Sequence, residues 1–279
     1  MTPKRPILSK YTENPRKEKI GKFFPIEIAD SEEDFLKRPV SPILPVSDIS
    51  DAEETVDKLN NNMIQDELKL IQLLLKATKE SNVGLANKII DSENFNTMAT
   101  DENGNIPLHF IAGYDEPEVT KKLLEKDRDS IYVQNNHGNT PMHFSTFNDK
   151  NENTELLLDE LVNQGNVSAA FLKNKKGYTA MNYSESHTLI KAAKSNNLEE
   201  AKKAYSEGAI INFQDNDGCT ALHYSSSTGD LSVTEFLLQN NAEKDIANNK
   251  KQTPKALVPI DKKHQFDILF GSYGKEQSR

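Results

Sequence analysis

From about residue 100 onwards, apolar residues recur in short groups, separated by polar stretches that contain Asn and Gly. Clear examples are LL at 123–124, LLL at 156–158 and FLL at 236–238. Apolar groups that recur at helical spacing predict amphipathic helices, and the Asn and Gly between them predict turns. The pattern therefore favours an all-α chain of many short helices.

The first 48 residues lack this pattern. Seven of the twelve prolines lie within the first 45 residues, and proline has no backbone donor and pushes the preceding residue towards extended conformations. We expect residues 1–48 to form a disordered, proline-rich tail. Within it, only GKFFPIEI (21–28) is apolar enough to dock on a folded surface.

A helical segment is predicted between this tail and the repeats described below. Ser50 and Glu53 have the spacing of a capping box, in which two side chains satisfy the first free N–H groups of a helix. Val56, Leu59 and Met63 follow at helical spacing. We expect residues 49–66 to form a capping helix that leads into the next part of the chain.

From about residue 100 the chain repeats one unit, whose starts are separated by 34, 39, 41 and 33 residues. A period of about 33 residues with a T-P-L-H core is the pattern of ankyrin repeats. Residues 101–270 therefore resemble an ankyrin-repeat array. The copies are DENGNIPLHF (101–110), NNHGNTPMHF (135–144), NKKGYTAMNY (174–183), DNDGCTALHY (215–224) and NNKKQTPKAL (248–257).

The residues of the unit fit its predicted turn and helices. Thr140 before Pro141, and Thr220 before Ala221, suit an N-cap followed by the first helical residue. One short helix pair cannot bury its own apolar face, so neighbouring pairs must stack. The resemblance implies an all-α ankyrin solenoid of helix–turn–helix units with β-turn tips. The glycines expected to adopt positive φ at these tips are Gly104, Gly138, Gly177 and Gly218.

Departures from the repeat suggest two sub-stacks. The third unit has Asn182 in place of histidine, and the last has Lys255 in place of leucine. Within the 41-residue interval, LIKAAKSNNLEEAKKAY (189–205) matches LLKATKESNVGLANKII (74–90), as a helix pair that begins a stack would. We expect a first sub-stack at 67–186, a second with a C-terminal cap at 187–271, and a tail at 272–279. The sub-stacks should pack end to end, with a change of curvature near 184–187.

The only cysteine offers one candidate for catalysis. Cys219 lies four residues before His223 and follows Asp215 and Asp217; these are the groups of a thiol nucleophile, its base and an orienting acid. The competing interpretation assigns all four to the repeat, in which Asp215 and Gly218 build the turn. G-x-x-x-x-G-K-[ST], H-E-x-x-H and G-x-S-x-G are absent from the sequence. We therefore expect no enzyme and no cofactor, with a thiol enzyme at Cys219 as the alternative.

The recurring histidines do not predict a metal site. Equivalent positions in stacked layers lie about 8–10 Å apart, whereas zinc holds each ligand nitrogen at about 2.0–2.1 Å. The ankyrin resemblance implies instead that His109, His143 and His223 tie down the turns by hydrogen bonding.

A series of aromatic residues directly follows the histidine position of the repeat. These side chains could form a stacking platform for a peptide. We expect them instead to pack between the first helix of one unit and the first helix of the next. The series is Phe110, Phe144, Tyr183 and Tyr224.

A partner surface is predicted at the positions that ankyrin repeats vary, namely the turn tips and the ends of the first helices. Tyr114, Phe147 and Tyr178 stand out there because aromatic side chains are enriched in binding hot spots; ordinary surface residues are the alternative. The complete prediction is Glu102, Asn103, Asn105, Tyr114, Asn136, His137, Asn139, Phe147, Asn148, Lys175, Lys176, Tyr178, Asn216, Asp217, Cys219, Ser227 and Thr228.

Charge and composition limit the classes of partner and the compartment that we expect. A net charge of -9 makes nucleic acid an unexpected partner, although residues 1–22 carry a local balance of +5. The sequence has no run of about 18 apolar residues, so no membrane insertion is expected. A single cysteine suits a reducing compartment. We expect a monomeric, cytoplasmic chain without a secretory signal peptide.

These expectations favour a non-catalytic protein-interaction module, acting as a scaffold, adaptor or inhibitor. The 28 Asn and 29 Lys against 5 Arg suggest an AT-rich coding sequence, which motivates a secreted bacterial effector acting in a host cytosol. The alternative is an endogenous cytosolic regulator whose N-terminal tail supplies a docking peptide. A purely structural element of a larger assembly is a third possibility.

Overall fold

The computed structural model describes residues 65–114 and 116–273. The predicted tail at 1–48 lies outside these residues, as does the predicted helix 49–66 except for its last two positions. The described α-helices are α3 (Gln65–Lys79), α4 (Val83–Asp91), α5 (Pro107–Ala112), α6 (Pro117–Lys126), α7 (Pro141–Phe147), α8 (Asn151–Asn163), α9 (Ala180–Lys194), α10 (Leu198–Ser206), α11 (Ala221–Thr228), α12 (Leu231–Gln239) and α13 (Lys263–Ser272). The 3-10 helices are η3 (Arg128–Tyr132), η4 (Val167–Phe171), η5 (Pro254–Leu257) and η6 (Ile260–Lys262).

The helices stack as antiparallel pairs in two rows. One row packs in the order α3, α5, α7, α9 and α11 and ends on η5, and the other contains α4, α6 and α8, followed by α10, α12 and α13. An isolated bridge between Lys173 and Thr179 is the only β pairing in the described residues. The predicted all-α solenoid with turn tips is confirmed.

Helix α6 shows why these segments become helices that stack. Val119, Leu123 and Leu124 are buried on one face, while Lys121 and Glu125 are exposed on the other. Burying one such apolar side chain contributes roughly 1.5–3 kcal/mol. Since a helix of ten residues is marginal alone, the packing of this face against α4 and α8 stabilises it.

The start of each first helix follows the local sequence. Helices α7 and α11 begin at Pro141 and Ala221, directly after Thr140 and Thr220 in extended conformations. Both predicted N-cap positions are confirmed. The four turn glycines have the predicted positive φ, between 74° and 81°: Gly104, Gly138, Gly177 and Gly218.

Helix α9 is longer than the helices on either side of it in its row. It has 15 residues, against 7 in α7 and 8 in α11. Eight further residues lengthen a helix by about 12 Å, which matches the surplus of the 41-residue interval. The helix is continuous through 184–187, so the predicted sub-stack boundary falls inside it. Residues 189–205, predicted to form a separate cap-like pair, are the second half of α9 together with α10.

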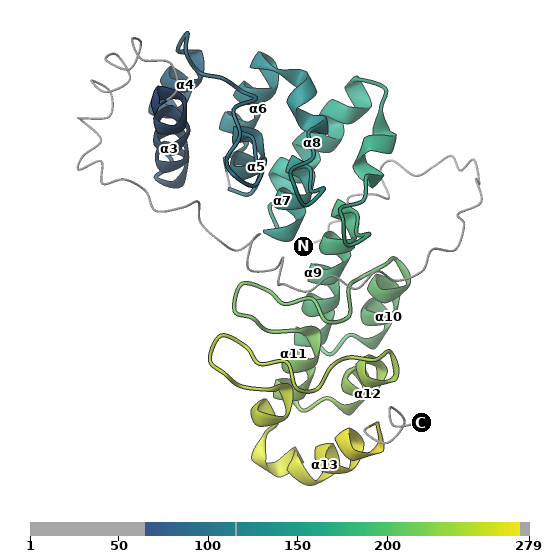
Figure 1. Cartoon of the computed structure of the whole chain (residues 1–279). Helices are drawn as coiled ribbons and strands as arrows, with labels where there is room; N and C mark the ends of the chain where they lie inside the picture. Colours follow the sequence, from purple (N-terminus) through teal and green to yellow (C-terminus); the bar gives the residue numbers. More distant parts are fainter. Residues whose placement is uncertain (1–64, 115, 274–279) are drawn as a thin grey trace.

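The array changes direction where α9 passes from one group of layers to the next. In Figure 1, the layers of α3 to α8 follow one another across the upper half, and α9 leads down to α10, α11, α12 and α13. Helix α9 contacts both α7 and α11. One apolar cluster extends from Leu70 to Met181 and a second from Phe144 to Phe270, so both clusters include residues of α7 and α9.

The last layer is closed by α13. Its residues Phe266 and Phe270 are buried against the second cluster, whereas Ile268 is 63% exposed. This helix therefore buries one apolar face and leaves an apolar residue on the other.

Candidate functional site

Five turn tips share one internal hydrogen-bond pattern. The first residue of each tip is Asp or Asn, whose side-chain oxygen accepts from the backbone N–H groups two and four residues later, at 2.8–3.0 Å. Such side chains replace missing backbone partners in turns. Sequence reasoning assigned this role only to Asp215; the recurrence of Asp or Asn at this position was the available signal. The five residues are Asp101, Asn135, Asn174, Asp215 and Asn248.

Backbone hydrogen bonds join successive tips into a ladder with one interruption. The second residue of a tip donates its N–H to the carbonyl oxygen of the third residue in the previous tip. Within the described residues, no backbone hydrogen bond joins tip 174–178 to tip 215–219. The ladder therefore has two parts, separated where α9 is long. Its three bonds run from Asn136 to Asn103 at 2.9 Å, from Lys175 to His137 at 2.9 Å, and from Asn249 to Asp217 at 3.0 Å.

A second set of contacts between tips is buried. The side-chain amide of Asn135 donates to Asn105 Oδ1 at 2.7 Å, and that of Asn174 donates to Asn139 Oδ1 at 2.9 Å. In the fourth unit, Cys219 Sγ takes the acceptor position at 3.5 Å from Asn248 Nδ2. The residues after three of the four turn glycines, Asn105, Asn139 and Cys219, therefore face the next layer instead of solvent.

The packing corrects the prediction that four residues are exposed at the partner surface. Asn105, Asn139 and Cys219 are at most 7% exposed because the following tip covers them. Phe147 is 1% exposed because its ring packs edge-on against Tyr183 and Phe213, both with ring centroids 5.4 Å away. None of these four side chains is exposed to solvent.

The other predicted contacts are reachable to differing degrees. Tyr114 packs against the first apolar cluster, and burial raises the pKa of its hydroxyl. The exposed residues are Glu102, Asn136, Lys175, Lys176, Asn216, Asp217, Ser227 and Thr228. The half-buried residues are Asn103, Tyr114, His137, Asn148 and Tyr178.

The histidines connect each first helix to the next layer. His143 Nδ1 accepts from the backbone N–H of Thr140 at 3.1 Å, and Nε2 lies 3.1 Å from the carbonyl oxygen of Tyr178. With Nδ1 accepting, Nε2 carries the proton and donates to Tyr178. Burial lowers the pKa of His109 and of His143 from 6.5 to about 4, which favours the neutral ring. The predicted bracing role is confirmed.

The aromatic series that follows these histidines is mainly packed. Phe144 and Tyr183 are at most 5% exposed, and the rings of Phe110 and Phe144 meet edge-on at 6.2 Å. Tyr224 is half-buried, and its hydroxyl donates to Asp215 Oδ2 at 2.7 Å. Packing between first helices, the expected role, therefore describes Phe144 and Tyr183.

Cys219 and His223 do not form a nucleophile and base. His223 Nδ1 accepts from Thr220 N–H at 3.0 Å, and Nε2 lies 3.1 Å from the carbonyl oxygen of Gln252. Both ring nitrogens are therefore engaged with backbone groups, and Cys219 is buried beside Asn248. Such an arrangement leaves no ring nitrogen to activate the thiol.

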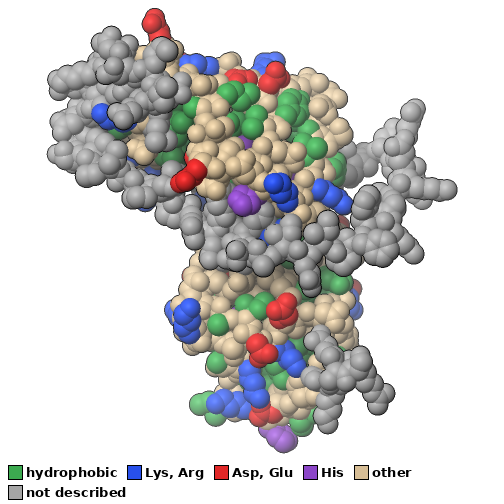
Figure 2. Space-filling model, viewed as in Figure 1, with side chains coloured by type: hydrophobic (Ala, Val, Ile, Leu, Met, Phe, Trp, Pro, Cys, Tyr) green, Lys and Arg blue, Asp and Glu red, His purple; other side chains and the backbone are tan. Residues whose placement is uncertain are grey.

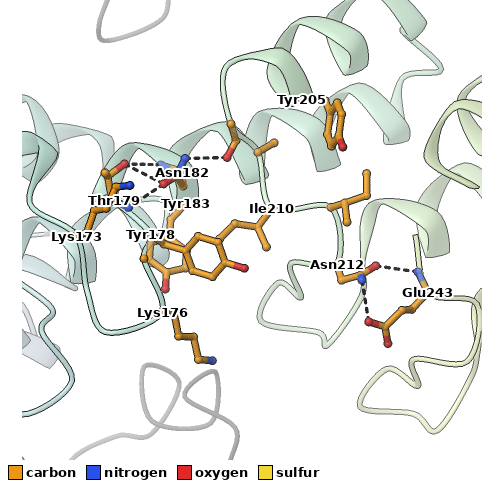
Figure 3. Close-up of a pocket in the computed structure, with 14 residues that line it drawn as sticks. Lys173, Lys176, Tyr178, Thr179, Asn182, Tyr183, Tyr205, Ile210, Asn212 and Glu243 are labelled. Carbon is orange, nitrogen blue, oxygen red and sulfur yellow. Dashed lines mark hydrogen bonds between the residues drawn. The ribbon is translucent and has the colours of Figure 1, made fainter. Parts of the chain in front are cut away.

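A groove opens where the tip ladder is interrupted, with a volume of about 770 Å³ (Figure 3). One side is formed by the third tip, including Lys173, Lys176 and Tyr178, and the other by the loop after α10, including Ile210 and Asn212. Sequence reasoning predicted Lys176 and Tyr178 as contacts but not the groove itself. The long 41-residue interval was the available signal.

Membrane-spanning helices and metal-binding clusters are both absent from residues 65–114 and 116–273. No helix there combines the length and the apolar character needed to cross a membrane. No group of three or more His, Cys, Asp or Glu side chains in the same part of the chain is arranged to hold a metal ion.

Family models of ankyrin repeats match two parts of the chain, residues 73–169 ("Ankyrin repeats (3 copies)") and residues 189–238 ("Ankyrin repeats (many copies)"). Among curated proteins, Alpha-latroinsectotoxin-Lt1a of Latrodectus tredecimguttatus is 46% identical over 48 residues, which are 17% of this chain and 3% of the toxin. Protein phosphatase 1 regulatory subunit 27 of Mus musculus is 32% identical over 84 residues, which are 30% of this chain and 54% of that protein. The chain thus spans little more than half of the mouse relative and a small fraction of the toxin.

Among solved structures, the ankyrin repeat domain of Bcl-3, described as a unique member of the IkappaB protein family, matches at 20% identity with a TM-score of 0.39. The match covers 71% of this chain and 98% of that domain.

Proposed function

Because the chain belongs to the ankyrin-repeat family, we propose that it is a non-catalytic module that recognises another protein through its turn tips and the adjoining ends of its first helices. The observation that carries this proposal is the hydrogen-bonded tip ladder. It fixes the spacing of exposed side chains before a partner arrives, so binding loses little conformational entropy. Glu102, Asn136 and Lys175 are exposed side chains on three successive tips.

The sign of the charge changes along this edge. Glu102 on the first tip is followed by Lys175 and Lys176 on the third and by Asp217 on the fourth, all exposed. Over the face seen in Figure 2, acidic and basic side chains are interspersed and do not gather into one patch of a single sign. We infer a partner whose charges alternate in a complementary order, because such a pattern sets register and excludes other proteins.

The test compares charge reversals at the tips with reversals elsewhere. Glu102→Arg combined with Asp217→Arg should reduce capture of a protein partner from cytosol by about tenfold, because two charged contacts with the partner are lost. Glu125→Arg combined with Glu155→Arg changes the charge equally on α6 and α8, away from the tips, where both residues are exposed. Equal capture by all three proteins, with equal urea midpoints, would rule out the tip surface.

The wider role that we propose is that of a scaffold, adaptor or inhibitor in a cytosol, as a monomer. The Asn- and Lys-rich composition favours an effector delivered by an intracellular bacterium. A reporter fused to the chain tests delivery, and failure to enter host cells excludes it. An endogenous regulator that docks partners through its tail would instead lose partner capture when residues 1–48 are deleted.

A further inference from the structure

The groove at the ladder interruption combines an apolar floor with a basic rim. Tyr178, Ile210 and Ile211 are half-buried there and pack against the second apolar cluster. Lys173 and Lys176 line the side formed by the third tip, and both are exposed. Figure 3 shows Tyr178 and Ile210 in the middle of the view, with Lys176 below them.

Glu243, the acidic residue among those that line the groove, lies at its far end and is already hydrogen-bonded to Asn212. Asn212 Nδ2 donates to Glu243 Oε1 at 3.0 Å, and Glu243 N–H donates to Asn212 Oδ1 at 2.9 Å. These bonds, drawn in Figure 3, close one end of the groove. A ligand that fits would therefore place apolar groups on the tyrosine and isoleucines and negative charge beside the lysines.

One segment of the chain has this chemistry in the required order. GKFFPIEI at 21–28 supplies two phenylalanines and two isoleucines around Pro25, and ADSEED at 29–34 follows with four acidic side chains. Proline at 25 favours an extended backbone at the residue before it, as a groove between two loops requires. We infer that residues 21–34 bind in this groove of the same chain, with the phenylalanines on the apolar floor and the acidic residues beside Lys173 and Lys176.

The connection is long enough for this contact. Residues 35–64 join the segment to the start of α3, and 30 extended residues span at most about 100 Å. If 49–64 were helical at about 1.5 Å per residue, the connection would still reach about 70 Å. Three layer steps of about 10 Å separate α3 from α9. Tethering also raises the local concentration of the segment to the millimolar range, which favours it over the same segment in a second copy of the chain.

The test uses the purified full chain, so it does not depend on the proposed partner. The photoreactive residue p-benzoylphenylalanine is placed at position 23, and mass spectrometry locates the cross-links after irradiation. We expect intramolecular cross-links within 173–183 or 205–212. Lys173→Glu combined with Lys176→Glu should lower their yield about fivefold or more, because two attractions become repulsions. Lys250→Glu combined with Lys251→Glu, the same change on exposed residues of the fifth tip, should leave the yield unchanged.

A charge-swap variant completes the test. Glu32→Lys combined with Glu33→Lys should restore the yield in the Lys173→Glu/Lys176→Glu protein. The inference is overturned by cross-links that scatter over other layers, by cross-links that join two chains, or by equal losses in the groove and fifth-tip variants. A reagent at position 8, in the basic arm, serves as the control for random contact and should not mark the groove.

Discussion

The side-chain amide of Asn182 donates a hydrogen bond to the carbonyl oxygen of Gly208 at 2.8 Å, in the position where other layers use histidine. Its Oδ1 accepts from the backbone N–H of Thr179 at 2.8 Å. His143 makes the same two kinds of contact, with Thr140 N–H and Tyr178 O. An asparagine therefore reproduces the acceptor and the donor of the neutral imidazole.

This equivalence predicts unequal effects of two substitutions at residue 143. His143→Ala leaves the buried Thr140 N–H and Tyr178 carbonyl without their partner and opens a cavity, so we expect a loss of roughly 2–4 kcal/mol in the free energy of unfolding. His143→Asn should lose less than half as much. Urea denaturation followed by circular dichroism measures both, and equal losses would show that ring volume outweighs the hydrogen bonds.

Acid should destabilise the fold through its buried histidines. The pKa of His143 is lowered to about 4 by burial, so between pH 6.5 and 4 the unfolded chain binds a proton that the folded chain does not. The stability contributed by the neutral His143 ring is therefore fully present above pH 6.5. It decreases as the pH falls from 6.5 to 4, by about 1.4 kcal/mol per pH unit. Unfolding of the wild type and His143→Asn from pH 7.5 to 4.5 isolates the contribution of His143. Parallel profiles would contradict it.

Glu185 should have the opposite pH dependence. Burial raises the pKa of this carboxyl to about 7, and the neighbouring Glu207 adds charge repulsion and a hydrogen bond; Lys203 acts against the shift and Glu200 acts with it. Because the folded pKa exceeds the unfolded one, stability falls as the pH rises from about 4.5 to 7.

Glu185→Gln keeps the shape of the side chain without this ionisation. We expect it to raise the free energy of unfolding by about 2 kcal/mol at pH 8 and to have a smaller effect at pH 4.5. Glu199→Gln, on the exposed surface of α10, is the matched control and should change little. A variant no more stable than the wild type at pH 8 would place the charge of Glu185 in solvent.

Two glycines with similar φ should differ in their tolerance of alanine. A Cβ at Gly218 would lie 2.9 Å from the backbone nitrogen of Asn249, whereas a Cβ at Gly177 would have no atom within 4 Å. Both substitutions incur roughly 1–2 kcal/mol for the left-handed backbone. We expect Gly218→Ala to cost at least about 1 kcal/mol more, because the fifth tip must move. Equal urea midpoints would mean that the fifth tip moves away from the new Cβ without a measurable loss of stability.

Position 219 should tolerate asparagine, and the Cys219 thiol of the native protein should react slowly with thiol reagents. Asn105 and Asn139 already occupy this position and accept a bond from the following layer, so Cys219→Asn should stay within about 1 kcal/mol of the wild type. Cys219→Leu removes the acceptor facing Asn248 and should cost more. A thiol reagent should label the native wild type slowly and the urea-unfolded chain quickly. Fast native labelling would contradict the burial of this thiol.

Much of the fold was predictable because its signals are local. The positive φ of Gly218, the helix start after Thr220 and the contact of His223 Nδ1 with Thr220 depend on residues within one unit. The continuous α9 was not predicted, although no Gly or Pro lies between Gly177 and Lys194 to interrupt it. The resemblance of 189–205 to 74–90 predicts a separate helix pair there instead.

By itself, the sequence determined the repeat unit, its turns and its stacking, because backbone conformation and short-range hydrogen bonds follow from neighbouring residues. Only the tertiary structure decided which turn side chains reach solvent. Asn105, Asn139 and Cys219 look like tip residues in the sequence, but each is covered by an asparagine from the next layer, about 30 residues away. The groove beside Tyr178 likewise exists because the extra length of α9 separates two tips that would otherwise pair. Both outcomes depend on how successive layers align, and that register is a property of the packed array.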